Sequence, residues 1–73
     1  PTLIVVHQDV PGMIAKVTNI LSETNTNIGT MTVTRESKGE NAIMIIEVDD
    51  PQVEETVRKL QQLPHIDSVN YFD

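Results

Sequence analysis

The 73-residue chain contains four segments whose apolar pattern predicts β-strands. Residues 2–7 (TLIVVH) and 42–48 (AIMIIEV) are apolar almost throughout, which is typical of central strands covered on both faces. Residues 28–36 carry threonine at alternate positions, and residues 66–72 mix polar and apolar side chains as an edge strand does. A turn containing Gly39 is expected to join the second and third strands as a hairpin.

Two further segments show the three- and four-residue apolar spacing of amphipathic helices. The first helix is predicted over residues 12–24, and the asparagine-rich sequence 25–27 ends it, because Asn tolerates the left-handed conformation. The second helix is predicted to start at residues 49–51, where carboxylates meet the positive end of the helix dipole, and to stop at Pro64. The apolar stripes are Met13, Ile14, Val17, Ile20 and Leu21 in the first helix, and Val53, Val57 and Leu60 in the second.

The order β-α-β-β-α-β predicts an α+β domain with the ferredoxin-like fold, in which one four-stranded antiparallel sheet carries both helices on one face. Residues 1–73 form a single domain in this interpretation, since no linker or low-complexity tract divides them. The chain starts within a strand and without methionine, which indicates a C-terminal piece of a longer polypeptide. The apolar first and third strands further predict that the other sheet face is covered by a second copy or a neighbouring domain.

The composition disfavours or excludes several classes of function. Eleven acidic and five basic residues give a formal net charge of −6, which opposes binding to nucleic-acid phosphates or to an anionic membrane. The chain has no cysteine and only two aromatic residues, so it lacks disulfides, cysteine-held metals and an aromatic platform for RNA bases. No apolar run reaches the roughly 20 residues of a membrane-spanning helix. We therefore expect a cytoplasmic domain with no catalytic residue, metal site or cofactor of its own.

The most distinctive chemistry lies between the first strand and the first helix, in the sequence DVPGMIAKV that begins at Asp9. A helix start offers N–H groups without intrahelical partners, which favour a carboxylate, and Gly12 lets a ligand approach the backbone. Asp9 is an acceptor that suits an ammonium group. We expect the loop at residues 7–12 to meet the loop at residues 25–29 at one end of the sheet. Together, these donors and acceptors match a free α-amino acid.

The stretch DVPGMIAKVTNILSETNTNIGTMTVTR resembles the signature of ACT domains, small regulatory modules that bind amino acids in metabolic enzymes. The resemblance covers the whole chain, including the Pro-Gly pair before the first helix and the Asn-Ile pair that opens the second strand. It is strongest to the C-terminal ACT domain in the β subunit of iron–sulfur L-serine dehydratases. The C-terminal domain of D-3-phosphoglycerate dehydrogenase is also similar.

In the serine-binding dehydrogenase domains, ligand contacts come from an H-x-N-x-P-G loop and from the Asn of the following N-I pair. The matching positions here are His7, Gly12 and Asn27, whereas Asp9 replaces the loop asparagine. An aspartate cannot donate to a carboxylate as an amide does, so the ligand sits differently or binds more weakly. The ligand-binding set that the resemblance implies is His7, Asp9, Pro11, Gly12, Met13, Asn27 and Ile28.

These residues also have purely structural interpretations. Asp9 can cap the first helix, and the Pro-Gly pair can serve only as a tight turn. Asn27 can be a turn residue, and His7 can be a partly exposed residue at the end of a strand. Arg35 is expected to be a solvated residue at the end of the hairpin.

The resemblance implies a regulatory domain that binds L-serine or another small amino acid within an L-serine dehydratase. That enzyme is an ammonia-lyase that converts serine to pyruvate and ammonia, a step linked to gluconeogenesis. The expected partners are the catalytic domain or subunit and a second copy joined through a sheet edge or face. A catalytic [4Fe–4S] cluster is expected elsewhere in the parent enzyme. Two alternatives stay open: the serine-sensing domain of a D-3-phosphoglycerate dehydrogenase, and a dimerisation module without a ligand.

Overall fold

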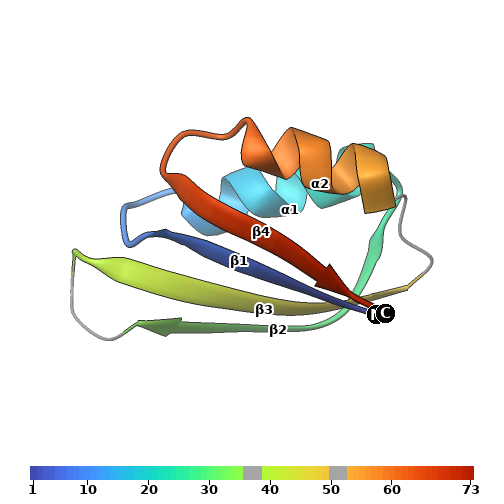
Figure 1. Ribbon diagram of the computed structural model, residues 1–73, viewed down its shortest axis with the longest axis horizontal. Helices are drawn as coiled ribbons and strands as arrows, with labels where there is room; N and C mark the ends of the chain where they lie inside the picture. The colour runs from blue at the N-terminus through green and yellow to red at the C-terminus, as the bar shows by residue number, and fades with distance from the viewer. Residues whose placement is uncertain (36–38, 50–52) are drawn as a thin grey trace.

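The computed structural model describes residues 1–35, 39–49 and 53–73. The elements have the predicted order, and the described strands and the first helix begin and end within one residue of the predicted positions. Glu36, the predicted last residue of the second strand, lies outside the described residues. The elements are β1 (Thr2–Gln8), α1 (Met13–Glu23), β2 (Asn27–Arg35), β3 (Asn41–Asp49), α2 (Val53–Gln61) and β4 (Ile66–Phe72) (Figure 1).

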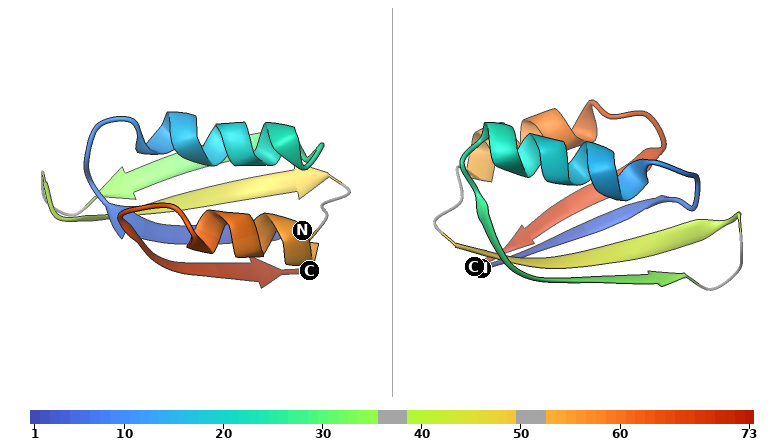
Figure 2. Two further views of the ribbon diagram at one scale, coloured as in Figure 1. Left: turned by 90° about the horizontal axis from the view of Figure 1, so that it is seen from above. Right: turned by 180° about the vertical axis from the view of Figure 1, so that it is seen from behind.

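The four strands form one antiparallel sheet in the order β2-β3-β1-β4. β1 pairs with β3 on one side and with β4 on the other, and β2 pairs with the far side of β3. Both helices lie next to each other on one face of the sheet, as Figures 1 and 2 show. This arrangement confirms the predicted ferredoxin-like βαββαβ fold.

The hydrophobic core fills the space between the two helices and the sheet. Every second residue of β1 and β3 points into it, as the alternating burial of both strands shows. Fully burying one aliphatic side chain of this kind stabilises the fold by about 1.5–3 kcal/mol. The buried cluster consists of Leu3, Val5, Val17, Leu21, Met44, Ile46, Val48, Leu60 and Val69.

The other face of the sheet is open within this chain, so the predicted coverage of β1 and β3 on both faces is not provided by the described residues. Ile43 and Ile45 are each 39% exposed, and Phe72 is 55% exposed. Ile4 and Val6 pair with the two isoleucines in register. Coverage of this face by a second copy or a neighbouring domain stays a prediction, because β-branched residues are favoured at exposed strand positions as well as at buried ones. We call these five residues the open face.

The helices depart from the predicted apolar stripes at two positions. Ile14 is 51% exposed, although its spacing matches the buried residues of α1. Thr56 is fully buried in α2, although it is polar and lies outside the predicted stripe. Asp49 is the last residue of β3 and not a helix cap, while residues 50 and 51 of the predicted helix start lie outside the described residues.

A cluster of buried hydroxyl groups joins the C-terminal end of α1 to α2. Thr56 Oγ1 donates to Thr24 Oγ1 at 3.0 Å, and Thr24 Oγ1 donates to the carbonyl oxygen of Ile20 at 3.0 Å. The hydroxyl oxygens of Thr24 and Thr26 are also 3.0 Å apart. Between them, Asn25 adopts a left-handed backbone with φ of 54°, as predicted for an asparagine at a helix end. Hydrogen bonding offsets the cost of burying these hydroxyls.

Candidate functional site

The residues of the predicted site lie at two opposite ends of the sheet. His7 and Arg35 both lie opposite Ala42 of β3, whereas Asn27 lies opposite Asp49. These two positions on β3 are seven residues apart, or roughly 24 Å along the strand. The prediction that the two loops meet at one end is therefore wrong within a single chain. β1 and β2 run in the same direction, so the end of β1 cannot adjoin the start of β2.

His7 is buried at the end of β1, with only 2% of its surface exposed, and the partly exposed position considered for it is wrong. Its Nδ1 lies 2.8 Å from the carbonyl oxygen of Gln8. Because a carbonyl oxygen only accepts, Nδ1 carries the proton in this hydrogen bond. Its Nε2 is buried and has no hydrogen-bond partner among the described residues. A buried polar atom in this state is rare and requires an explanation.

A groove of 240 Å³ lies at the N-terminus of α1, and His7 lines it. Gly12 precedes the helix with a φ of 87°, and no side chain of residues 1–35, 39–49 or 53–73 caps the first N–H groups of α1. A helix terminus of this kind favours an anionic group. We call this space the α1 groove. Its lining residues are His7, Asp9, Val10, Pro11, Gly12, Met13, Ile14, Ala15 and Val33.

Gly12 owes its place in the loop to its backbone conformation. A side chain built at this position would meet no atom within 4 Å, so close packing does not require glycine. The left-handed φ is strained for other residues and supplies the requirement. Pro11 is exposed beside it, and Met13 is buried in the first turn of α1. The structure thus brings Pro11, Gly12 and Met13 together with His7.

The Asp9 carboxylate binds the end of the β2–β3 hairpin and does not cap α1. Its Oδ2 accepts a hydrogen bond from Arg35 Nη1 at 2.8 Å and a second from the Gly39 backbone N–H at 3.2 Å. The bond from Arg35, followed by that from Gly39, lowers the pKa of the Asp9 carboxyl below its usual value. We call the contacts among Asp9, Arg35 and Gly39 the clasp. The sequence suggested that Arg35 is a solvated residue at the end of the hairpin, but its side chain also binds Asp9.

Asn27 lies at the first position of β2, at the opposite end of the sheet from the α1 groove. Its side-chain Nδ2 donates to Asp49 Oδ2 at 3.0 Å. This bond orients the amide and leaves the Asn27 Oδ1 as an acceptor. The adjacent Ile28, which the resemblance placed in the ligand site, is half-buried and packs against the core.

Sequence reasoning missed Arg35 and Val33 as neighbours of the groove. Asp9 and Arg35 are 26 positions apart, so no local spacing could have paired them. Val33 had a signal, because it alternates with Met31 and so lies on the helix-bearing face of β2. Val33 lines the groove and Arg35 contacts Asp9 because the end of β2 lies at the same end of the sheet as the end of β1.

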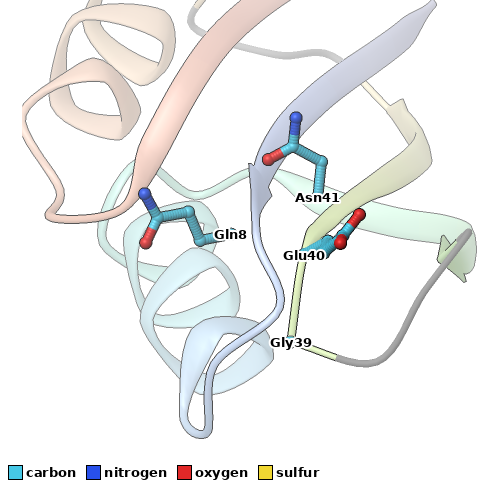
Figure 3. A pocket seen from close by; sticks show the side chains of 4 residues that line it. All are labelled: Gln8, Gly39, Glu40 and Asn41. Carbon is cyan, nitrogen blue, oxygen red and sulfur yellow. The ribbon is translucent and has the colours of Figure 1, made fainter.

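A second, polar depression of 510 Å³ lies at this end of the sheet, lined by Gln8, Gly39, Glu40 and Asn41. Figure 3 shows Gln8 extending from β1, Asn41 from the start of β3, and Glu40 from the position just before β3. Gln8 is engaged elsewhere, because its Oε1 lies 3.1 Å from Nδ1 of His65. Gly39 lines this depression and also belongs to the clasp, so the two features share the hairpin end.

The described part of the chain has neither a metal-binding cluster nor a membrane-spanning helix. Residues 1–35, 39–49 and 53–73 contain no group of three or more His, Cys, Asp or Glu side chains that could hold a metal ion. No helix within these ranges has the length and apolar content needed to cross a membrane.

The profile of the family described as ACT domain matches residues 2–65. The chain belongs to the ACT domain family. The match includes both β1–α1 and the start of β2, so both ends of the predicted site lie within it.

The chain is similar to segments of two kinds of larger enzyme. The protein named D-3-phosphoglycerate dehydrogenase 3, chloroplastic, from Arabidopsis thaliana is 42% identical over 81% of this chain and 10% of its own length. The probable L-serine dehydratase, beta chain, of Bacillus subtilis is 41% identical over 90% of this chain and 30% of its own length. The D-3-phosphoglycerate dehydrogenase of the same organism is 40% identical over 92% of this chain and 13% of its own length. The chain thus spans less than a third of each relative.

A solved ACT domain supports the fold independently. The ACT domain from the GTP pyrophosphokinase of Chlorobium tepidum superposes with a TM-score of 0.74, covering 94% of this chain and 91% of that one. Sequence identity is 19%, so the likeness concerns the fold alone.

Proposed function

We propose that this chain is the regulatory, amino-acid-binding ACT domain of a larger enzyme, that its ligand is L-serine, and that two copies build each site. The observation that carries the proposal is the state of His7 beside α1. Within the described part of the chain, a buried Nε2 without a hydrogen-bond partner and a helix N-terminus without a side-chain cap line the same groove. An amino acid supplies both missing partners, a carboxylate for the helix and a hydrogen-bonding group for the imidazole.

The second copy is needed because Asn27 lies at the far end of its own sheet. β2 is an edge strand with one unpaired side, so it can pair with β2 of another copy about a two-fold axis. In an antiparallel pairing along the full strand, Asn27 of one copy lies opposite Arg35 of the other. Asn27 then arrives beside the α1 groove of its partner, and two equivalent sites form per dimer.

In this composite site the two halves have complementary roles. The N–H groups at the start of α1 receive the serine carboxylate, and Gly12 keeps the approach free of a side chain. Asn27 from the second copy offers Oδ1 to the ammonium group, because its Nδ2 is held by Asp49. The His7 Nε2, which has no partner among the described residues, forms a hydrogen bond with the serine hydroxyl. These roles support a small polar amino acid over a large apolar one.

For the parent enzyme we propose an L-serine dehydratase, with a D-3-phosphoglycerate dehydrogenase as the alternative. Relatives of both kinds, at 40–42% identity, support the choice of a serine-handling enzyme. A [4Fe–4S] cluster in a dehydratase parent has to lie outside this chain, because the chain has no cysteine. Serine would act by a population shift, favouring the domain arrangement that binds it more tightly.

The composite site can be tested by mixing two variants that are each defective at a different end. His7→Asn removes the groove acceptor, and Asn27→Ala removes the amide at the other end. L-serine affinity is measured by calorimetry for the wild-type chain, for each variant and for an equimolar mixture. In the mixture, about half of the dimers contain one chain of each variant, and each of these mixed dimers has one intact site out of two. About a quarter of the wild-type stoichiometry should therefore return. Amide NMR spectra of both variants check that they are folded.

Each result bears on a different part of the proposal. If L-serine binds neither the wild-type chain nor the mixture, amino-acid binding by this domain is contradicted. Wild-type binding without recovery in the mixture contradicts the two-copy site and leaves one chain as the binding unit. A strong loss in His7→Asn with no effect of Asn27→Ala removes Asn27 from the site.

A second candidate function, an assembly module without a ligand, is favoured by the open face. Three of its residues, Ile43, Ile45 and Phe72, are substantially exposed. Exposed apolar surface of this kind is typical of interaction sites. The same calorimetric experiment separates the candidates, because an assembly module self-associates without responding to L-serine.

A further inference from the structure

The clasp bears on an electrostatic repulsion between the Asp9 carboxylate and an anionic ligand in the groove that Asp9 lines. Asp9 is the only acidic residue between β1 and α1, and it belongs to the lining of the α1 groove. A free carboxylate at this position repels a ligand carboxylate bound at the start of α1. The ion pair with Arg35 holds Asp9 at 2.8 Å on the hairpin side.

We propose that Arg35 is a positioning residue for the ligand, which neutralises Asp9 and holds its carboxylate away from the anion position at the start of α1. This inference rests on the proposed function, since it concerns the same groove. Arg35 does not line the α1 groove, so it acts through Asp9 and not by touching the ligand in that space.

Backbone hydrogen bonds help to fix the position of Asp9 in the loop between β1 and α1. The Asp9 N–H donates to the carbonyl oxygen of Glu40 at 2.6 Å, and Oδ2 accepts from Gly39 and Arg35. Asp9 is therefore bound to the hairpin end by its backbone as well as its side chain. Only the guanidinium of Arg35 supplies a full positive charge in these contacts, which makes it the group that cancels the Asp9 charge.

The space on the other side of the clasp supports this separation. A neighbouring depression of 390 Å³ is lined by Asp9, Val10, Pro11, Arg35 and Gly39. It shares Asp9, Val10 and Pro11 with the α1 groove, but its lining includes Arg35 and not His7. Arg35 and the N-terminus of α1 thus border two neighbouring spaces, and Asp9 lines both of them.

The test is a double-mutant cycle of Arg35→Gln and Asp9→Asn with L-serine as the probe. Arg35→Gln should weaken L-serine binding by about fivefold, because Asp9 is left charged beside the ligand carboxylate. Asp9→Asn removes that charge, so the double variant should bind within about twofold of Asp9→Asn alone. Arg58→Gln, which removes an exposed arginine of α2, is the matched control for the change in net charge.

A second probe distinguishes charge neutralisation from a structural role of Arg35. L-serinamide keeps the ammonium group and hydroxyl of serine but lacks the carboxylate. Arg35→Gln should not weaken its binding, whereas a disordered loop would weaken both probes equally. High salt should reduce the effect of Arg35→Gln on L-serine, because the repulsion is screened.

The outcomes separate this inference from the proposed function. If the wild-type chain binds no L-serine, the proposed function fails and the inference fails with it. If the wild-type chain binds L-serine but Arg35→Gln binds equally well, or loses L-serine and L-serinamide alike, only the inference is overturned. If the double variant binds L-serine as weakly as Arg35→Gln does, the inference is likewise overturned and the proposed function is not.

Discussion

The guanidinium of Arg35 donates to Asp9, and this hydrogen bond is the largest cause of the lowered pKa of the Asp9 carboxyl. A carboxyl whose pKa is lower in the folded than in the unfolded state stabilises the fold at pH values above its unfolded pKa. The excess stability of the wild-type chain over Asp9→Asn should therefore be constant near neutral pH. It should shrink as the pH approaches the ordinary value of 3.8 and vanish below the lowered folded-state value.

Urea unfolding of both proteins, at about pH 6 and at about pH 3, measures this difference in the free energy of unfolding. Asp67→Asn, at an exposed position on β4, is the control for the loss of one negative charge. A gap between wild type and Asp9→Asn that stays unchanged at the lower pH contradicts the clasp as the source of the stabilisation.

At the level of single residues, backbone requirements were easier to predict than partners. The sequence predicted that Gly39 is free to adopt a positive φ, and its φ is 81°, whereas Gly12 was singled out for a tight turn and for ligand approach and has a φ of 87°. It identified His7 as a candidate but not its burial, since a histidine at a strand end is compatible with both environments. It could not identify Arg35 as the partner of Asp9, because the contact depends on the sheet order.

The hydroxyl cluster of Thr24, Thr26 and Thr56 gives a test at the level of secondary-structure elements. Thr56→Val keeps the side-chain shape but removes the hydroxyl that donates to Thr24. We expect a loss of about 1 kcal/mol in the free energy of unfolding, which is typical for one buried hydrogen bond. Urea unfolding followed by circular dichroism measures the loss.

Thr18→Val is the matched control, because Thr18 donates to the carbonyl oxygen of Ile14 on an exposed part of α1. Its stability should stay within about 0.5 kcal/mol of wild type. If Thr56→Val is as stable as the control, the buried hydroxyl bond does not hold α2 against α1, and packing of Leu60 has that role instead.

The elements themselves followed from periodicity, and their environments did so only in part. Strand and helix ends were predicted within one residue for most elements, because proline, glycine and asparagine mark the boundaries. The apolar runs of β1 and β3 were interpreted as covered on both faces, and the described residues of this chain cover one of these faces. A run of β-branched residues fits both situations, so only the arrangement of the elements could decide between them.

On the scale of the whole molecule, the proposed dimer predicts which sheet edge becomes protected from solvent. β2 and β4 are the two edge strands, and only pairing through β2 brings Asn27 to the groove of another copy. Alternate backbone N–H groups of an edge strand point outward and exchange rapidly with water unless another strand pairs with them. Amide hydrogen exchange should therefore slow at alternate residues of β2 as protein concentration rises, while the outward N–H groups of β4 serve as the internal control.

Ile45→Glu separates this edge-paired dimer from association through the open face. The substitution places a charge in the middle of the open face, on β3, where it cannot touch the outer side of β2. If the dimer forms through β2, sedimentation of Ile45→Glu and its β2 protection should match wild type, because no β2 edge bond is altered. Loss of the dimer in Ile45→Glu, or protection that appears at β4, contradicts pairing through β2. It would also leave Asn27 without a route to a second groove, since the two ends of one sheet lie too far apart to bind one amino acid.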